Sequence, residues 1–357
     1  MQCSYFDAGT CASCSWLPQA YADQVAAKQH HSESLLPPTD WLPAVPSAEV
    51  GFRNKAKLVI GGGPGAVTVG ILDGNQRGVD LRECGLYEPG LAHAVRAVAD
   101  LVDQVRLLPY DVPKRRGELK HVLLTHSPNG ELMVRFVLRS LQQAARITPE
   151  AVRAFLPQAR VITLNVQPDH KAVLEGPTEI VVSEQDHLLM RLDKPLWLGP
   201  RSFFQTNTAV AQELYRQARR WAERLSPAFV VDAYCGVGGF ALHVATPGRE
   251  VVGIDTQPGR DTAGVRFIQG DVITTTRDLP SPDLVILNPP RRGVGALTEW
   301  IQRTRPAHVI YSSCNPASLA GDLARLPGYA VLEARVFDMF PHTSHQEVMV
   351  LLETMAS

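Results

Sequence analysis

The pattern of hydrophobic and polar positions changes character at about residue 199. From there onward, short apolar runs alternate with glycine-containing turns and with segments of helical spacing. Such continuous apolar runs are typical of strands that are buried on both faces of a parallel sheet. A helix is predicted at residues 209–225, and strands at residues 229–232, 250–255, 265–268, 284–287, 308–311, 330–337 and 348–352. This order predicts a doubly wound α/β sheet, with ligands at the carboxyl ends of its strands.

Residues 51–198 show a different pattern, with strands and few helices. Two hairpins are predicted, one pairing residues 57–60 with 67–72 and one pairing 121–125 with 131–138. Residues 91–105 have helical spacing, and further strands are predicted at 161–166 and 179–183. The glycine-rich run 61–65 is interpreted as a turn, because no Lys-Ser/Thr pair follows it and it opens no helix. The pattern indicates a central α+β domain.

The chain is therefore expected to have three parts. Residues 1–50 form a short cysteine-rich segment, 51–198 the central α+β domain, and 199–357 the α/β domain. The first segment is too small to bury a core of its own. We expect a metal and docking onto the next domain to order it.

Composition restricts the classes of function. The 357 residues are 45% hydrophobic and 20% charged, with a net charge of −1, as in an ordinary globular protein. Contact with RNA would therefore have to come from local basic patches. The N-terminus does not have the pattern of a signal peptide, and no apolar run approaches the length of a membrane span. We expect a cytoplasmic protein without membrane contact, and a monomer by default.

The cysteines are unevenly spaced. Cys3, Cys11 and Cys14 crowd the first fourteen residues, and Cys84 follows much later. In a reducing compartment this spacing favours metal ligation over disulfides. Four thiolates suit either zinc or an iron–sulfur cluster, and spacing alone leaves zinc as the default.

A fifth cysteine lies in a different context. Cys314 follows an apolar strand and precedes a predicted helix, for which Asn315 is a suitable N-cap and Pro316 a suitable first residue. A sulfur at a helix N-terminus lies in a positive field, so we expect the nucleophilic thiolate to be favoured. An isolated cysteine of this kind is more often an inert buried residue, but here other motifs accompany it.

Those motifs describe a cofactor site. Asp232 ends a predicted strand, the glycine turn 236–239 follows, and Asp255 ends the next strand, where an acid can bind ribose hydroxyls. This pattern alone would also suit NAD. The tripeptide 288–290, Asn-Pro-Pro at a further strand end, favours S-adenosylmethionine. Because Arg291 rather than an aromatic residue follows it, carbon methylation is favoured over methylation of an amino group.

Carbon methylation of a uracil ring requires two protein groups. The C5 atom is too weak a nucleophile until a thiolate adds at C6, and a base must afterwards remove the C5 proton. Cys314 is the candidate nucleophile and Glu347 the candidate base. His342 and His345 near Glu347 make only a poor case for a metal site.

Seven motifs together carry a resemblance to a known family. They are Met1-Gln2-Cys3, Phe52–Lys55, Lys114–Glu118, Ser202–Asn207, Asn288–Gly293, Ser312–Asn315 and Phe340–Thr343. Over nearly its whole length the chain resembles the RNA uracil-C5 methyltransferases. It is most similar to the branch that modifies a single-stranded hairpin-loop uridine in domain II of 23S rRNA.

The resemblance implies a Rossmann-like class I methyltransferase sheet in the C-terminal domain and 23S rRNA as the partner. It implies S-adenosylmethionine contacts at Gln205, Tyr234, Asp255 and Asn288. It further implies a [4Fe–4S] cluster, in place of zinc, at Cys3, Cys11, Cys14 and Cys84. Cys314 as nucleophile and Glu347 as base agree with the family pattern.

The chain departs from that pattern near the cofactor site. Tyr234 and Asp255 stand where relatives usually have phenylalanine and glutamate. Only nine residues, Thr256 to Gly264, separate two predicted strands where the family has a full helix. We expect this helix to be lost or reduced to a turn, which would uncover apolar sheet surface and weaken cofactor binding.

Two other functions remain possible at the level of sequence. One is an amino-group methyltransferase, and the other is a cluster-bearing RNA-binding protein with impaired catalysis. Candidate RNA contacts are Arg53, Lys55, Lys57, the group Lys114, Arg115, Arg116 and Lys120, and the pair Arg291 and Arg292.

Overall fold

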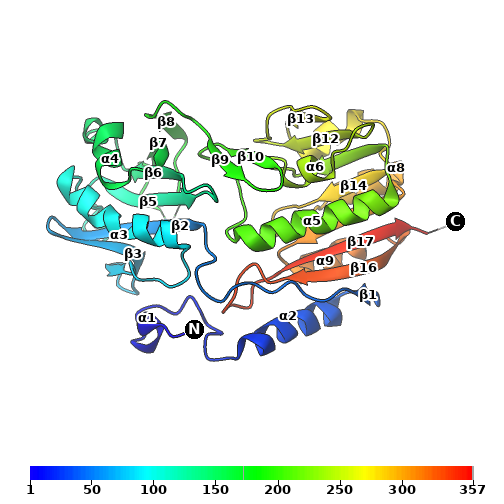
Figure 1. Cartoon of the computed structure of the whole chain (residues 1–357), viewed down its shortest axis with the longest axis horizontal. Coiled ribbons are helices and arrows are strands. Elements are labelled where there is room, and N and C mark those ends of the chain that lie inside the picture. The colour runs from blue at the N-terminus through cyan, green and yellow to red at the C-terminus, as the bar shows by residue number, and fades with distance from the viewer. Residues whose placement is uncertain (172, 356–357) are drawn as a thin grey trace. The chain divides into compact units, whose positions relative to one another are not determined.

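Two large sheets organise the chain, one in each of two structural units (Figure 1). The computed structural model describes residues 1–171 and 173–355. Unit 1 comprises Met1–Ser13, Glu49–Arg191 and Leu198–Pro200, and unit 2 comprises Cys14–Ala48, Leu192–Trp197 and the chain from Arg201 onward. The three-part division expected from the sequence stays a prediction.

Unit 1 is built on a seven-stranded sheet of order β4-β3-β2-β5-β6-β7-β8, in which only the β6/β7 pair is parallel. Its strands are β2 (Lys55–Gly63), β3 (Ala66–Leu72), β4 (Gly78–Asp80), β5 (Leu119–His126), β6 (Leu132–Leu138), β7 (Ala159–Val166) and β8 (Thr178–Val181). The helices α3 (Pro89–Gln104) and α4 (Pro149–Phe155) share one core with the sheet. Short elements are α1 (Ser4–Asp7), η1 (Ala144–Arg146) and β9 (Leu188–Arg191). Both predicted hairpins are confirmed.

Unit 2 contains an eight-stranded sheet of order β1-β16-β17-β15-β14-β11-β12-β13. Its strands are β1 (Asp40–Trp41), β11 (Phe229–Ala233), β12 (Glu250–Asp255), β13 (Val265–Gln269), β14 (Leu284–Leu287), β15 (His308–Ser313), β16 (Tyr329–Phe337) and β17 (Glu347–Thr354). All neighbours are parallel except that β17 runs antiparallel to both β15 and β16. The predicted doubly wound α/β sheet is confirmed.

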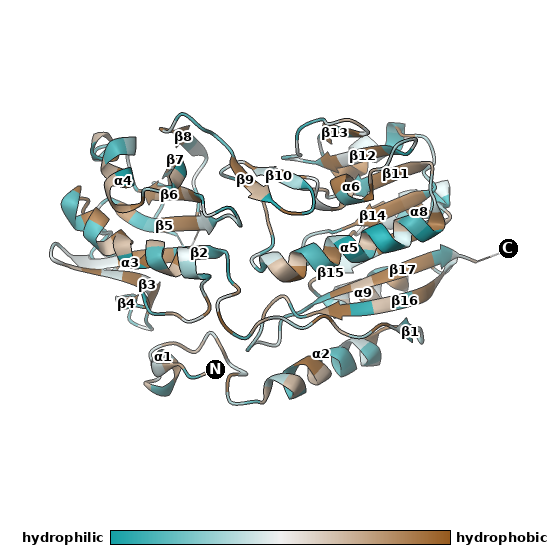
Figure 2. Ribbon diagram, viewed as in Figure 1, coloured by the Kyte–Doolittle hydropathy of each residue, from teal (hydrophilic) through white to brown (hydrophobic). Residues whose placement is uncertain are grey.

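The helices of unit 2 lie between these strands in sequence. They are α5 (Thr208–Leu225), α6 (Gly239–Val244), α7 (Val272–Thr275), η2 (Thr276–Asp278), α8 (Leu297–Thr304) and α9 (Pro316–Leu323), and β10 (Pro195–Leu198) precedes them. Figure 2 shows hydrophobic residues along β11 and β14, which are buried, and many hydrophilic residues on α5. No helix within the described ranges is both long and apolar enough to cross a membrane.

The strand order places three loop positions side by side. Ala233 at the end of β11 pairs with Leu287 of β14 on one side and with Ile254 of β12 on the other. The residues that follow these strand ends therefore meet at the carboxyl edge of the sheet. The strand order reverses here, because β12 and β13 extend the sheet on one side of β11, and β14 and β15 extend it on the other. This is the position at which open α/β sheets bind their ligands.

The N-terminal segment contributes a helix that the sequence pattern did not predict. Helix α2 (Tyr21–Leu35) buries the polar residues Gln24, Lys28 and Ser32, and β1 adds an edge strand beside β16. The expectation that this segment docks onto the next domain in sequence was wrong for Cys14–Ala48, which belongs to unit 2. A buried ion pair fixes it there, because Lys28 Nζ lies 2.6 Å from Asp338 Oδ1.

The expected loss of a crossover helix is confirmed. Residues 256–264, which the structure describes throughout, contain no helix between the parallel strands β12 and β13. A hollow of about 610 Å³ borders the second half of this connection and is lined in part by Leu242, Ala245 and Val265. The expectation of uncovered apolar sheet surface was wrong for β12, since Val251, Val252 and Ile254 are buried.

Candidate active site

Cys314 lies in a tightly bonded turn between β15 and α9. Asn315 caps α9, since its Oδ1 accepts the amide N–H of Ala317 at 3.2 Å, as expected from the sequence. Its Nδ2 donates to the carbonyl of Arg291 at 3.3 Å, and its own N–H donates to Ser313 Oγ at 3.1 Å. These bonds fix the cysteine between the end of the sheet and the loop that carries Arg291.

The strand register brings Cys314 and Glu347 together. The paired register of β15 and β17 ends with Ser313 opposite Val348. Cys314 directly follows the first of these residues and Glu347 directly precedes the second, so both lie at the same end of the strand pair. The negative charge of Glu347 raises the pKa of Cys314, as expected of close neighbours. The two residues with candidate catalytic roles are therefore neighbours.

Glu347 is buried rather than exposed. Its side chain is only 2% exposed, and Ser312 Oγ donates a hydrogen bond to its Oε1. Burial raises the pKa of Glu347 to about 7, although the bond from Ser312 favours the charged form. A carboxyl group with a pKa close to neutrality suits a general base.

The expectation of a favoured Cys314 thiolate was wrong. Burial raises the pKa of the Cys314 thiol, and the charge of Glu347 raises it further, against a smaller opposing effect of Arg291. A thiolate at Cys314 and a carboxylate at Glu347 therefore disfavour each other.

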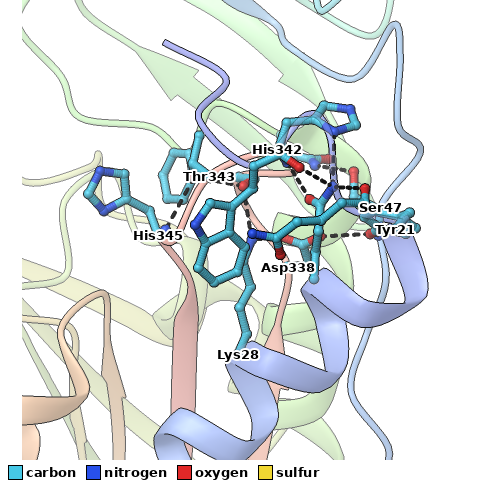
Figure 3. Close-up of polar contacts among 12 residues, drawn as sticks. Tyr21, Lys28, Ser47, Asp338, His342, Thr343 and His345 are labelled. Carbon is cyan, nitrogen blue, oxygen red and sulfur yellow. Dashed lines mark hydrogen bonds and ion pairs between the residues drawn. The ribbon is translucent and has the colours of Figure 1, made fainter. Parts of the chain in front are cut away.

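A cavity of about 490 Å³ opens at Cys314. Its lining comes from the N-terminal segment, the Arg291 loop, the turn between β15 and α9, and the turn before β17. The lining residues are Trp16, Ala27, Lys28, His31, Arg291, Cys314, Asn315, Pro316, Ser344, His345 and Gln346. Trp16 and His31 are site residues that the sequence pattern did not predict, because nothing in their spacing connects the first 35 residues to Cys314. Figure 3 shows part of this wall, with Lys28 directed from α2 toward Asp338.

Three candidate cofactor residues follow adjacent strands. Tyr234 comes after β11, Asn288 after β14, and Asp255 ends β12. Tyr234 has a φ of 66°, a strained conformation for a residue other than glycine. The Asp255 carboxylate accepts the N–H of Gly236 at 3.1 Å and thereby supports the glycine turn. Gln205 is 5% exposed and lies in the turn before α5 of the same unit.

The glycine turn packs closely against its own unit. Gly238 has a φ of +89°, and a Cβ there would lie 2.4 Å from the ring of Phe267. Beneath the turn, Asp232 is fully buried, and burial raises the pKa of its carboxyl to about 8. Its Oδ2 accepts the N–H of Ala241, whereas Oδ1 has no hydrogen-bond partner within the described part of the chain. The sequence marked Asp232 only as a strand end.

The predicted cluster cysteines are divided between the units. Cys3, Cys11 and Cys84 belong to unit 1, and Cys14 is the first residue of unit 2. Burial raises the pKa of Cys84, and charges at Cys3 and Cys11 add to the effect, so these three thiols lie near one another. Among residues 1–171 and 173–355, however, no group of three or more His, Cys, Asp or Glu side chains is arranged to hold a metal ion. The structure does not confirm the cluster.

The candidate RNA contacts differ in accessibility. Lys114, Arg115 and Arg116 are exposed in one turn, and Arg291 and Arg292 are also exposed. By contrast, Lys120 is buried and donates to the carbonyl of Asp169 at 2.6 Å. Burial also lowers the pKa of Lys55 to about 8. The exposed groups are the better candidates for phosphate contact.

Comparison with known proteins decides the family. Residues 280–355 match the family model described as tRNA (Uracil-5-)-methyltransferase. The 23S rRNA (uracil(747)-C(5))-methyltransferase RlmC of Escherichia coli O157:H7 (strain EC4115 / EHEC) is 41% identical over 99% of this chain and 100% of its own. The protein of the same name from Halothiobacillus neapolitanus is 42% identical over 99% of both chains. The chain belongs to the RNA uracil-C5 methyltransferase family.

A solved structure supports the same assignment. The Pyrococcus abyssi tRNA (uracil-54, C5)-methyltransferase in complex with S-adenosyl-L-homocysteine matches with a TM-score of 0.77 and 25% identity. The match covers 95% of this chain and 85% of that one. The chain is therefore an S-adenosylmethionine-dependent RNA uracil-C5 methyltransferase, and methylation of an amino group is set aside.

Proposed function

We propose that this enzyme methylates C5 of a single-stranded loop uridine in 23S rRNA, the one for which its relatives are named, uracil 747. Cys314 acts as the nucleophile and Glu347 as the base. The observation that carries the proposal is the pairing of β15 with β17, which brings Cys314 and the buried Glu347 to the same end of the strand pair, beside one cavity. The relatives' identity over the whole chain supports the choice of RNA.

The proposed reaction begins with the uridine extruded from its stack, which is easiest in a loop. The thiolate of Cys314 forms a bond to C6, and the negative charge moves from sulfur to the ring. C5 then takes the methyl group that S-adenosylmethionine would supply; S-adenosylhomocysteine would leave with the electron pair of the broken sulfur–methyl bond, and the adduct would be neutral. The carboxylate of Glu347 removes the C5 proton, the C5–C6 double bond re-forms, and the C6–S bond breaks to release Cys314 as a thiolate.

The electrostatic repulsion between a Cys314 thiolate and a Glu347 carboxylate agrees with this order of reaction steps. While Cys314 is a thiolate, its charge disfavours ionisation of the neighbouring Glu347. Bonding to C6 moves this charge to the ring, and methyl transfer to C5 then neutralises the adduct, so that Glu347 ionises more readily. The base is thus favoured by methyl transfer, the step that creates its substrate.

Gln205, Tyr234, Asp255 and Asn288 are proposed to hold S-adenosylmethionine at the carboxyl edge of the sheet. When bound, the cofactor supplies an electrophilic sulfonium methyl group. The strand ends of β11, β12 and β14 and the glycine turn support this placement. Asp255 both supports the turn and is available to the ribose.

We propose a [4Fe–4S] cluster at Cys3, Cys11, Cys14 and Cys84, with a structural role. The spacing of the cysteines and the mutual effect of three thiols support it. Anaerobically purified protein is expected to contain iron and sulfide, and Cys11→Ala is expected to lose both together with solubility. Full solubility and activity of a cluster-free Cys11→Ala would contradict the structural role. We also propose that the protein is a cytoplasmic monomer.

The decisive experiment is transfer of labelled methyl from S-adenosylmethionine to 23S rRNA lacking the modification. Wild type is expected to form 5-methyluridine at position 747, and Cys314→Ala none. Glu347→Gln is expected to accumulate a methylated covalent adduct that resists denaturation. Calorimetric cofactor binding by Cys314→Ala serves as the control for folding. No transfer by folded wild type, with RNA affinity retained, would favour a catalytically impaired RNA-binding protein.

A further inference from the structure

Part of the cavity at Cys314 is formed by the beginning of the chain. Trp16, Ala27, Lys28 and His31 line it together with Cys314 and Arg291. All of these residues belong to unit 2. The part of the N-terminal segment that belongs to unit 2, from Cys14 onward, therefore contributes to the cavity at Cys314.

Hydrogen bonds hold the backbone of Trp16 at both its N–H and its carbonyl group. Its N–H donates to the carbonyl of His342 at 2.9 Å, and its carbonyl accepts Gln24 Nε2 at 3.1 Å. Lys28 Nζ lies 5.7 Å from the centre of the indole ring. Lys28 is itself 1% exposed, paired with Asp338 and bonded to the carbonyl of Phe340 at 3.0 Å (Figure 3). The ring is thus held in place by buried polar groups.

The degree of burial separates Trp16 from the residues that anchor this segment. Gln24, Lys28 and Ser32 are fully buried, as expected for anchors, whereas Trp16 stays half-buried at the cavity. A half-exposed aromatic ring in a fixed position is the surface on which an unstacked base regains stacking. Arg291 and His31, both exposed, lie at the same cavity and suit the neighbouring phosphates.

We propose that Trp16 is a substrate-binding residue whose indole stacks on a loop base at or beside the target uridine. The inference rests on the proposed function, because it assumes that the cavity at Cys314 receives RNA. It makes the N-terminal segment part of the nucleotide pocket. Base stacking tolerates any base, so Trp16 contributes affinity for an extruded nucleotide rather than choice of sequence.

The test uses a synthetic RNA hairpin with the 23S loop sequence, and three matched hairpins that are abasic at the target uridine or at either neighbour. Binding is measured without S-adenosylmethionine, so that failure of methylation does not affect the result. Trp16→Ala is expected to weaken binding of the intact hairpin about 5- to 150-fold. Against one of the abasic hairpins, wild type and Trp16→Ala are expected to bind equally.

Two further variants serve as controls. Trp16→Phe retains a ring and is expected to bind within a few-fold of wild type. Leu17→Ala changes the adjacent residue, which does not line the cavity, and is expected to leave binding unchanged. Equal loss of affinity for all four hairpins would show a structural role alone and overturn the proposal. So would unchanged binding of the intact hairpin by a folded Trp16→Ala.

Discussion

Ser312 Oγ donates a hydrogen bond to Glu347 Oε1 inside the sheet, two positions before Cys314 in the same run of chain. This bond favours the charged form of Glu347 and so opposes the effect of burial. Ser312 thereby acts on the base that is proposed to resolve the covalent adduct, although it does not line the cavity itself.

Replacement of Ser312 by valine is expected to raise the pKa of Glu347 above its value of about 7. Because fewer Glu347 side chains are then ionised at a given pH, breakdown of the methylated adduct should need a higher pH. The measurement is the fraction of denaturation-resistant RNA–protein adduct from pH 6 to 9. Ser312→Thr keeps the hydroxyl and should follow wild type. An identical pH profile for Ser312→Val would contradict the role.

Replacement of Glu347 by glutamine is expected to stabilise the fold at high pH. In wild type the folded-state pKa is raised from 4.5 to about 7, so folding loses stability as pH rises from about 4.5 through 7. The glutamine side chain does not ionise, so the gain should reach about 3 kcal/mol at pH 8 and vanish near pH 4. Thermal unfolding at pH 5 and pH 8 checks this, and equal melting shifts at both values would be inconsistent with it.

Replacement of Lys28 by methionine is expected to destabilise unit 2. It would leave Asp338 fully buried without its cation, and breaking a buried pair in this way costs about 3–5 kcal/mol. Urea unfolding measures the loss. The double variant Lys28→Met with Asp338→Asn removes both charges and should recover part of it. A double variant no more stable than the single one would argue against an ion-pair effect.

Replacement of Lys114, Arg115 and Arg116 by alanine should weaken RNA binding and flatten its salt dependence. For each phosphate that the protein no longer neutralises, the slope of log affinity against log salt falls in magnitude by about 0.7–0.9. The same substitution at buried Lys120 should leave the slope unchanged, because its ammonium group already bonds to Asp169. An unaltered slope for the triple variant would exclude this turn from the RNA interface.

The missing crossover helix predicts weak cofactor binding. Calorimetric affinity for S-adenosylmethionine should be lower than that of the Escherichia coli relative, since Thr256–Gly264 leaves a hollow beside β13. Insertion of a relative's helix between Asp255 and Val265 should restore it. Equal affinity in the two native proteins would refute the link between this connection and the cofactor site.

The sequence predicted the strands of unit 2 well because each is a continuous apolar run. The bounds of β12 and β14 agree to the residue, and so the positions of Asp255 and Asn288 at strand ends were predictable. The proximity of Cys314 and Glu347 was not predictable, because it depends on the pairing of an antiparallel strand formed from the end of the chain. Helix α2 was missed because the face it buries is polar. The raised pKa of Cys314 likewise depends on burial and on Glu347, which spacing does not reveal.

The ion pair between Lys28 and Asp338 joins residues 310 positions apart in the chain. During synthesis at about 5–20 residues per second, Lys28 therefore waits roughly 15–60 s for its partner. Throughout most of that time α2 has no β16 to pack against, while the longest segment of unit 1, Glu49–Arg191, is made and can fold in between. The pocket at Cys314 is lined both by residues made early, such as Trp16 and Lys28, and by residues made late, such as His345 and Gln346. A nascent chain stopped before β17 therefore contains every residue that lines the pocket but lacks Glu347, the proposed base.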